Sequence, residues 1–251
     1  MDYTAADAVA AGFERAVLIV REEVQEELME HIGKHWPSAL EVVPVVQGPI
    51  AGTAQAVASA REAVSGAFGV VNADDLYGAA ALSLLGSELR ALGERTHAII
   101  GYRLTETVLS DAVVTRGVCE TTPAGDLVRV VEQEVRRSDS GFAGRPIGST
   151  DDVPWQALEP DILVSMNLWG LAESIFDDLE AALAAFDPAT APHSPGKPPE
   201  LLLPSVVGRL VASGAISVRV RPTEGRCIGI THPEDLPLVR KIVAEDRHAR
   251  R

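Results

Sequence analysis

The sequence predicts a single α/β domain in which helices flank a mostly parallel sheet that carries an antiparallel insertion. Through the first hundred residues, short apolar, β-branched runs alternate with helical patterns, as is typical of parallel strands joined by right-handed crossovers. After residue 112 the pattern changes to two strands joined by a short turn, which indicates an antiparallel hairpin. The chain has 251 residues, so it is long enough to bury one sizeable core.

Apolar periodicity and turn residues place the individual elements along the chain. Short, β-branched runs predict strands at residues 16–20, 41–46, 68–71, 97–102, 113–120, 127–132, 161–168 and 216–220. A helical period predicts helices at residues 4–11, 22–35, 77–92, 173–186, 200–213 and 233–246, and one more that starts at Gly52-Thr53-Ala54. The glycine- and serine-rich stretch 138–153 and the proline-rich stretch 187–199 are predicted to be loops.

Composition excludes several classes of partner. The net charge is −14 and the isoelectric point is about 4.8, which argues against nucleic acid or an anionic membrane, because both require a basic surface. No apolar run is long enough to cross a bilayer, and the first residues do not resemble a signal peptide. We therefore expect a cytoplasmic protein. Cys119 and Cys227 have no metal-binding spacing, so we interpret them as buried thiols.

A glycine turn follows the strand predicted at residues 41–46. Gly52, Thr53 and Ala54 begin a helix that is rich in small residues. Small residues allow a flat ligand to approach the backbone closely. The same pattern also suits an ordinary capped helix that packs tightly on the sheet.

An acidic segment ends the apolar run of residues 68–71. Asn72, Asp74 and Asp75 follow that run directly, and ligands of open α/β sheets bind where parallel strands end. Two adjacent carboxylates repel each other unless a cation neutralises them, which suggests Mg²⁺ with a phosphorylated substrate. The alternative is that both aspartates cap the helix that starts near Gly78.

Taken together, Gln47, GPIAGTAQA and VVNADDLYG resemble the sugar-1-phosphate nucleotidyltransferases. In that family a QP…GTA or GLAQA segment holds the nucleobase, and an aspartate at a strand end binds the metal. The resemblance extends over nearly the whole chain, through GYRL at 101–104, TRGVCE at 115–120, VSMNLWG at 164–170, LLLPSVV at 201–207 and GITHPEDLPLV at 229–239.

The resemblance implies a Rossmann-like, GT-A-like nucleotidyltransferase fold. Residues 1–103 would form the nucleotide-binding half, which is incomplete at its N-terminal end. Residues 104–251 would form the sugar-phosphate-binding half with the antiparallel sugar-binding insertion. A homo-oligomer is compatible with this assignment.

The resemblance also implies an enzyme of nucleotide-sugar biosynthesis. The phosphate of a sugar 1-phosphate would attack the α-phosphorus of an NTP and give NDP-sugar and pyrophosphate. Catalysis would consist mainly of positioning and charge neutralisation. The implied roles are Mg²⁺ binding and catalysis for Asp74, with Asp75 in support; nucleotide binding for Gln47, Gly52, Thr53 and Asn72; and sugar-phosphate binding for Glu132 and Asn167.

Three features depart from the family pattern. Many relatives have a lysine after the sugar-binding glutamate, whereas this chain has Gln133. A second metal-binding aspartate is replaced by the segment Cys227-Ile228-Gly229, so that ligand is absent or supplied by Asp75. Relatives also begin with a strand and a glycine-rich loop bearing Arg and Lys, whereas this chain begins with MDYTAADAVAAGF.

The missing loop leaves two interpretations open, because an attacked triphosphate loses its main stabilisation without donors and cations around it. In the first, Met1 is an internal methionine of a longer, active protein. In the second, the chain is a non-catalytic homologue or partner subunit that binds a nucleotide or a nucleotide sugar.

Overall fold

The computed structural model describes residues 1–48, 52–108, 111–139, 141–150, 152–189 and 199–229, together with residues 240, 241 and 243. Its helices are α1 (Asp2–Ala10), α2 (Glu22–His35), α3 (Thr53–Ala58), α4 (Ala79–Leu89), α5 (Ile175–Ala184) and α6 (Leu203–Ala212). Its strands are β1 (Arg15–Val20), β2 (Glu41–Val46), β3 (Phe68–Val70), β4 (Asp75–Leu76), β5 (Thr96–Arg103), β6 (Val114–Thr121), β7 (Leu127–Ser138), β8 (Gly141–Pro146), β9 (Gln156–Leu158), β10 (Leu163–Leu171), β11 (Ser217–Thr223) and β12 (Ile228–Gly229).

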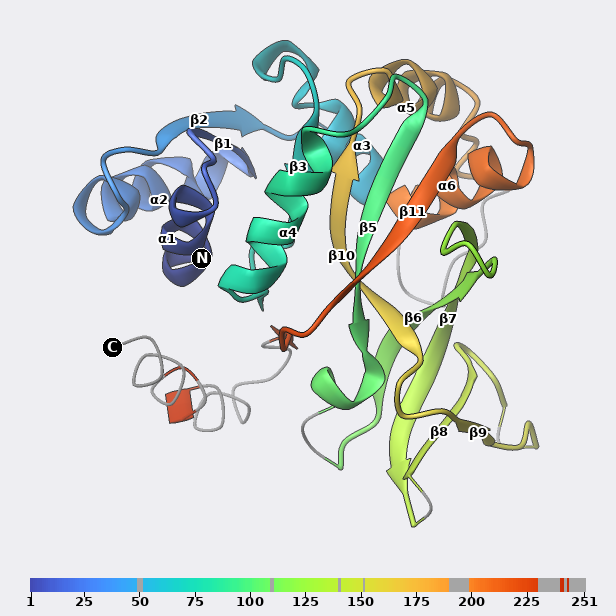
Figure 1. Cartoon of the computed structure of the whole chain (residues 1–251). Coiled ribbons are helices and arrows are strands. Elements are labelled where there is room, and N and C mark those ends of the chain that lie inside the picture. Colours follow the sequence, from blue (N-terminus) through green and yellow to red (C-terminus); the bar gives the residue numbers. More distant parts are fainter. Residues whose placement is uncertain are drawn as a thin grey trace.

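The central sheet has the order β11-β5-β10-β6-β7-β8-β9, and β3 pairs with β10 beside β6 (Figure 1). Strands β11 and β5 are parallel, whereas β10 runs antiparallel to β5, β3 and β6. The α/β class with flanking helices is confirmed, but the sheet is mixed rather than mostly parallel. The reason is that β10, which follows the antiparallel strands β6 to β9 in the chain, lies between β3 and β5 and runs antiparallel to both.

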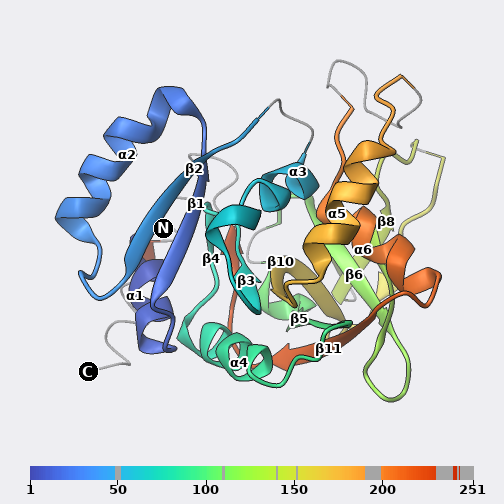
Figure 2. The same cartoon turned by 90° about the horizontal axis from the view of Figure 1, so that it is seen from above.

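Two apolar cores lie on opposite faces of this sheet. Successive side chains of a strand point to opposite faces, so Ile99 packs with α3, α5 and α6, whereas Ile100 packs with α4. Figure 2 shows α3 and α5 on one side of the sheet and α4 on the other. The buried side chains Trp169, Leu171, Phe176 and Leu179 lie in the first core, and Tyr77, Leu85, Tyr102 and Leu168 lie in the second.

Strands β1 and β2 form a separate parallel pair, with α2 against β2 (Figure 2). Val20 accepts a hydrogen bond from the Gln47 N–H on the β2 side. Backbone directions alternate along a strand, so Ile19 directs its N–H and C=O to the opposite edge. No strand among the described residues pairs with that edge, and the side chains of β1 are mostly only half-buried. The parallel sheet predicted for the first half is therefore split into two parts.

Most predicted elements are found close to their expected residues, and the helix at 22–35 and the strand at 41–46 have the predicted bounds. The loop predicted at 138–153 is wrong, because β8 lies within it and pairs with both β7 and β9. Glycine-rich composition conceals this strand, which is defined by its neighbours rather than by propensity. The predicted loop at 187–199 and helix at 233–246 lie mostly outside the described residues.

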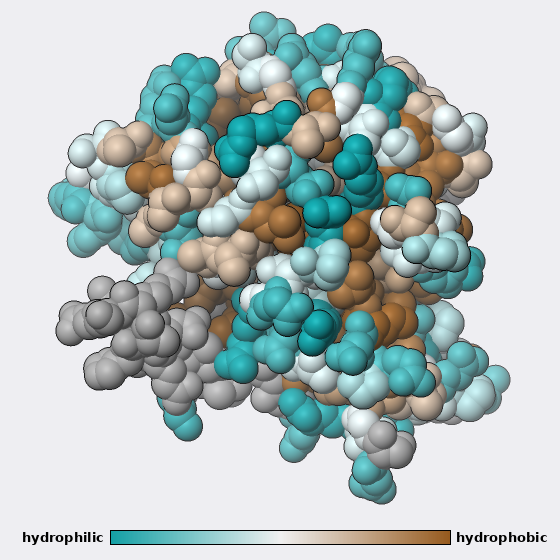
Figure 3. All heavy atoms as spheres, in the orientation of Figure 1, coloured by the Kyte–Doolittle hydropathy of each residue, from teal (hydrophilic) through white to brown (hydrophobic). Residues whose placement is uncertain are grey.

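The visible surface is largely hydrophilic. In Figure 3 hydrophilic side chains cover much of the visible face, and apolar side chains show among them near the middle, over the central sheet. Among the described residues, no helix combines the length and the apolar character that crossing a bilayer requires.

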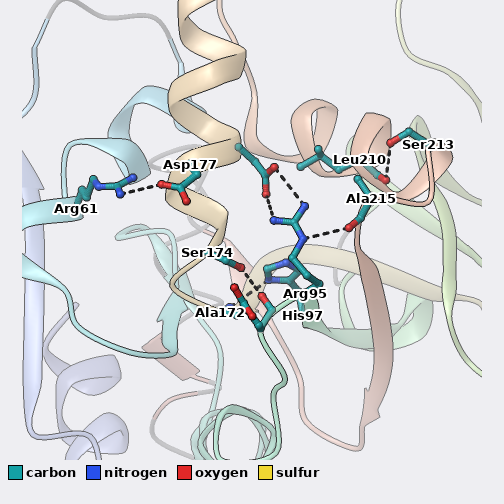
Figure 4. A network of polar contacts seen from close by, with 11 residues as sticks. Arg61, Arg95, His97, Ala172, Ser174, Asp177, Leu210, Ser213 and Ala215 are labelled. Carbon is teal, nitrogen blue, oxygen red and sulfur yellow. Dashed lines mark hydrogen bonds and ion pairs between the residues drawn. The ribbon is translucent and has the colours of Figure 1, made fainter.

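A polar network joins the start of β5 to α5 (Figure 4). Arg95 forms an ion pair with Asp178, at 2.9 Å between Nη1 and Oδ2. The adjacent His97 is fully buried, and its Nδ1 accepts a hydrogen bond from the Ala172 N–H at 3.1 Å. Its Nε2 has no partner among the described residues. Burial, and secondarily the Arg95 charge, lower the pKa of His97 to about 4.

We expect His97 to make the fold sensitive to acid. The folded state disfavours the imidazolium. The contribution of neutral His97 to the free energy of unfolding is therefore complete above pH 6.5 and is lost as the pH falls towards 4. Wild type should lose about 3 kcal/mol more unfolding free energy between pH 7 and pH 4 than His97→Asn, whose amide oxygen can replace Nδ1 as acceptor. Urea unfolding at both pH values measures the difference, and equal losses for the two proteins would contradict the assignment.

Candidate active site

The acidic segment predicted from the sequence lies between β3 and β4. Asp74 is exposed and Asp75 is buried. The Asn72 side chain donates from Nδ2 to Oδ2 of Asp75 at 2.9 Å, so two of the predicted site residues are in direct contact. The two aspartates do not cap α4, because Gly78 occupies its N-cap position and no side chain caps it.

The environment of Asp75 opposes its ionisation. Burial is the largest cause that raises the pKa of Asp75, and the neighbouring Asp74 charge raises it further. Hydrogen bonds from Asn72 and Tyr77 and the more distant Arg116 charge act in the opposite direction. A cation beside the two carboxylates would favour the ionised form of both.

Strand β12 covers the other side of this segment. Gly229 pairs with Asp75, and a Cβ at Gly229 would lie 2.8 Å from Oδ1 of Asp75. The carboxylate of Asp75 therefore occupies the space that a side chain at position 229 would need. Among the described residues, no three His, Cys, Asp or Glu side chains are grouped as metal ligands.

Tyr77 is a member of the site that the sequence did not single out. Its hydroxyl is buried, accepts a hydrogen bond from the Asn72 N–H at 2.9 Å, and lies 2.9 Å from the Met166 carbonyl oxygen. It also lies 3.3 Å from Oδ2 of Asp75. The only sequence signal was its place two residues after Asp75 in NADDLYG.

The second predicted half of the site is an irregularity in β10. The register shifts between Ser165 and Trp169, and Asn167 between them has φ +58°. The Asn167 N–H donates to Oγ of Ser165 at 3.2 Å, and its Oδ1 accepts from Nε1 of Trp169 at 3.5 Å. Bulges and left-handed residues of this kind cluster at functional sites, and Asn tolerates the conformation. The bulge leaves Asn167 half-exposed in an otherwise buried stretch.

Glu132 belongs to the same face of the sheet as the bulge. Ser165 pairs with Gly117 and Gly117 pairs with Glu132. A Cβ at Gly117 would lie 3.1 Å from Oε1 of Glu132, so the glycine allows the carboxylate to lie over β6. The Glu132 side chain is accessible to solvent, yet desolvation by surrounding protein raises its pKa, with Arg116 acting in the opposite direction.

Arg116 is the second residue that sequence reasoning missed. Its guanidinium donates to the backbone carbonyls of Thr107 and Thr115, and its Nε is buried with no partner among the described residues. Burial lowers the pKa of Arg116, and the charges of Asp75 and Glu132 oppose that effect. An arginine in a strand pattern resembles a solvated residue, so no sequence signal identified it.

The predicted base-binding turn packs against the backbone of the segment that leads into α6. Gly52 has φ +91°, and a Cβ there would lie 2.6 Å from the Leu201 carbonyl oxygen. Oγ1 of Thr53 accepts a hydrogen bond from the Leu203 N–H at 2.9 Å. The space beside Gly52 is therefore filled by backbone, contrary to the expectation that it is left open for a base. Among the described residues, no hydrogen bond or ion pair joins Gln47, Gly52 or Thr53 to Asp74 or Asp75.

Comparisons with known proteins point to one family. Residues 1–108 match the family model described as nucleotidyl transferase. No curated protein matches the chain. This match supports the predicted resemblance to nucleotidyltransferases over residues 1–108, and solved structures share the fold over most of the chain.

Three of these structures cover most of the chain. The inositol-1-phosphate CTP transferase from T. maritima has a TM-score of 0.62 at 15% identity, covering 93% of this chain and 76% of that one. UDP-glucose pyrophosphorylase from Acinetobacter baumannii has a TM-score of 0.54 at 17% identity, with coverages of 90% and 75%. HddC from Yersinia pseudotuberculosis has a TM-score of 0.56 at 14% identity, with coverages of 93% and 81%. At these identities the likeness shows the fold alone.

Proposed function

We propose that the protein transfers a nucleotidyl group from an NTP to a sugar 1-phosphate, and the match of residues 1–108 to the nucleotidyl transferase family model supports the proposal. The observation that carries the proposal is the contact between the acidic segment and the β10 bulge. Tyr77 joins Asn72 to Met166, the residue before Asn167. The segment proposed to bind nucleotide and metal thus meets the segment proposed to bind the sugar phosphate.

In the proposed reaction, a phosphate oxygen of the sugar 1-phosphate attacks the α-phosphorus of the NTP in line. The bond from the α-phosphorus to the oxygen that bridges the β-phosphate breaks, and the electron pair leaves with pyrophosphate. No protein nucleophile is required, so catalysis rests on positioning and charge neutralisation.

Asp74 and Asp75 are the proposed ligands of Mg²⁺. The donor set fits this ion, because Mg²⁺ commonly takes one or two carboxylates from the protein and its remaining ligands from substrate phosphates and water. When bound, Mg²⁺ neutralises the phosphate charge that develops during transfer. Asn72 holds the carboxylate of Asp75 through its 2.9 Å hydrogen bond.

The substrates are proposed to lie on either side of this segment. Gln47, Thr53 and Asn72 bind the nucleotide, and the amide of Gln47 can pair with several bases through either end. Gly52 serves this side by shaping the turn. Glu132 accepts hydrogen bonds from sugar hydroxyls, and Asn167, presented by the bulge, orients the sugar phosphate.

A second candidate function is a non-catalytic homologue or partner subunit that binds a nucleotide or nucleotide sugar. It is favoured by one observation, namely that the guanidinium of Arg116 already donates to backbone carbonyls of the chain. A guanidinium whose N–H groups already donate within the chain has fewer donors left to bind a triphosphate.

A coupled assay for pyrophosphate release, run over a panel of NTPs and sugar 1-phosphates, tests the proposal. We expect Mg²⁺-dependent release that requires both substrates. Nucleotide binding by calorimetry without pyrophosphate release from any pair would instead support the non-catalytic function.

A further inference from the structure

Three segments distant in the chain converge on the hydroxyl of Tyr77. Tyr77 is fully buried, and its hydroxyl accepts the Asn72 N–H at 2.9 Å. The hydroxyl can donate to the Met166 carbonyl oxygen at 2.9 Å or to Oδ2 of Asp75 at 3.3 Å. The strand end after β3, the β4 segment and the β10 bulge are therefore held by one group.

Each of these contacts lies next to a residue of the proposed reaction. Asn72 precedes the two aspartates and donates to Asp75, and Met166 directly precedes Asn167 in β10. Strand β3 pairs with β10 only as far as Val70 and Trp169, so among the described residues the Tyr77 hydroxyl is the group that joins Asn72 to Met166 beyond the end of that ladder. Beyond the ladder, the hydroxyl of Tyr77 therefore sets the position of the metal-binding side relative to the sugar side of the site.

We propose that Tyr77 is a positioning residue that fixes the Asp74–Asp75 segment against the β10 bulge, so that the two substrates meet in line. This inference rests on the proposed function. Tyr77 does not contact the reacting atoms. A small misplacement of reacting groups can cost about 100-fold in rate while leaving binding largely intact.

Tyr102 provides a matched control. It is equally buried, and its hydroxyl donates to the Tyr77 carbonyl oxygen at 3.0 Å. Tyr77→Phe and Tyr102→Phe therefore each remove one buried hydroxyl and one hydrogen bond to a backbone carbonyl. Only Tyr77→Phe also removes the contacts with Asn72 and Asp75.

The first experiment compares kcat and KM of the three proteins at a temperature where all are folded, with thermal unfolding measured for each. Tyr77→Phe should lower kcat by about 10- to 100-fold and change KM for either substrate by less than about 3-fold. Tyr102→Phe should change kcat by less than about 3-fold. Equal kcat losses in both variants, or a loss in Tyr77→Phe confined to KM, would overturn the positioning role.

The second experiment needs no turnover, and therefore separates this inference from the proposed function. Amide hydrogen exchange of Asn72 should become at least about 10-fold faster in Tyr77→Phe than in wild type, because its acceptor is removed. It should be unchanged in Tyr102→Phe. Unchanged Asn72 exchange in Tyr77→Phe would overturn the inference even if the wild type is active, whereas an inactive wild type would overturn the proposed function alone.

Discussion

We expect Asp74→Asn to lower nucleotidyl transfer by at least about 100-fold while leaving the fold intact. Asp74 is exposed within the acidic segment, so the substitution removes a charge without opening a cavity. A neutral amide is a much weaker ligand for a hard cation than a carboxylate. Turnover at saturating Mg²⁺, together with thermal unfolding, measures both effects.

Asp75→Asn is the control for this prediction. The Asp75 carboxylate already accepts from Asn72 and lies against Gly229, and an amide oxygen can keep the hydrogen bond. We expect a smaller loss of turnover than in Asp74→Asn. Near wild-type turnover of Asp74→Asn would show that the acidic segment does not hold the metal.

Gly52→Val should destabilise the protein by about 3 kcal/mol or more. Gly52 has φ +91°, a conformation that β-branched residues avoid, and its Cβ would lie 2.6 Å from the Leu201 carbonyl oxygen and 2.9 Å from the Leu201 nitrogen. The atoms that this Cβ would meet belong to the Leu201 backbone, which cannot move aside as a flexible side chain can. The chemical midpoint in urea should fall clearly.

Gly48→Val provides the comparison, because among the described residues a Cβ at Gly48 would meet only the end of the Gln55 side chain, at 3.4 Å. We expect a far smaller shift of the midpoint for this variant. Equal midpoints for Gly52→Val and wild type would show that the turn adapts, and would restore the interpretation that Gly52 leaves space for a base.

The acidic site segment could be predicted from the sequence because its signal is local. An apolar, β-branched run followed at once by Asn72, Asp74 and Asp75 specifies a strand and the groups at its end. The alternation of strands and helices likewise predicted the α/β class. Glycine-rich β8 was missed because its composition favours a loop, and the strand exists only through pairing with β7 and β9.

The sequence by itself determined the α/β class, the acidic segment and the identity of the polar groups near it. Only the tertiary structure decided which distant groups meet. Tyr77 contacts Met166 across 89 positions of the chain, and Thr53 contacts Leu203 across 150. It also decided that β10 runs antiparallel between β3 and β5. The physical reason is that hydrophobic period specifies an element and its buried face, whereas strand direction and contacts between elements depend on how distant apolar faces pack together.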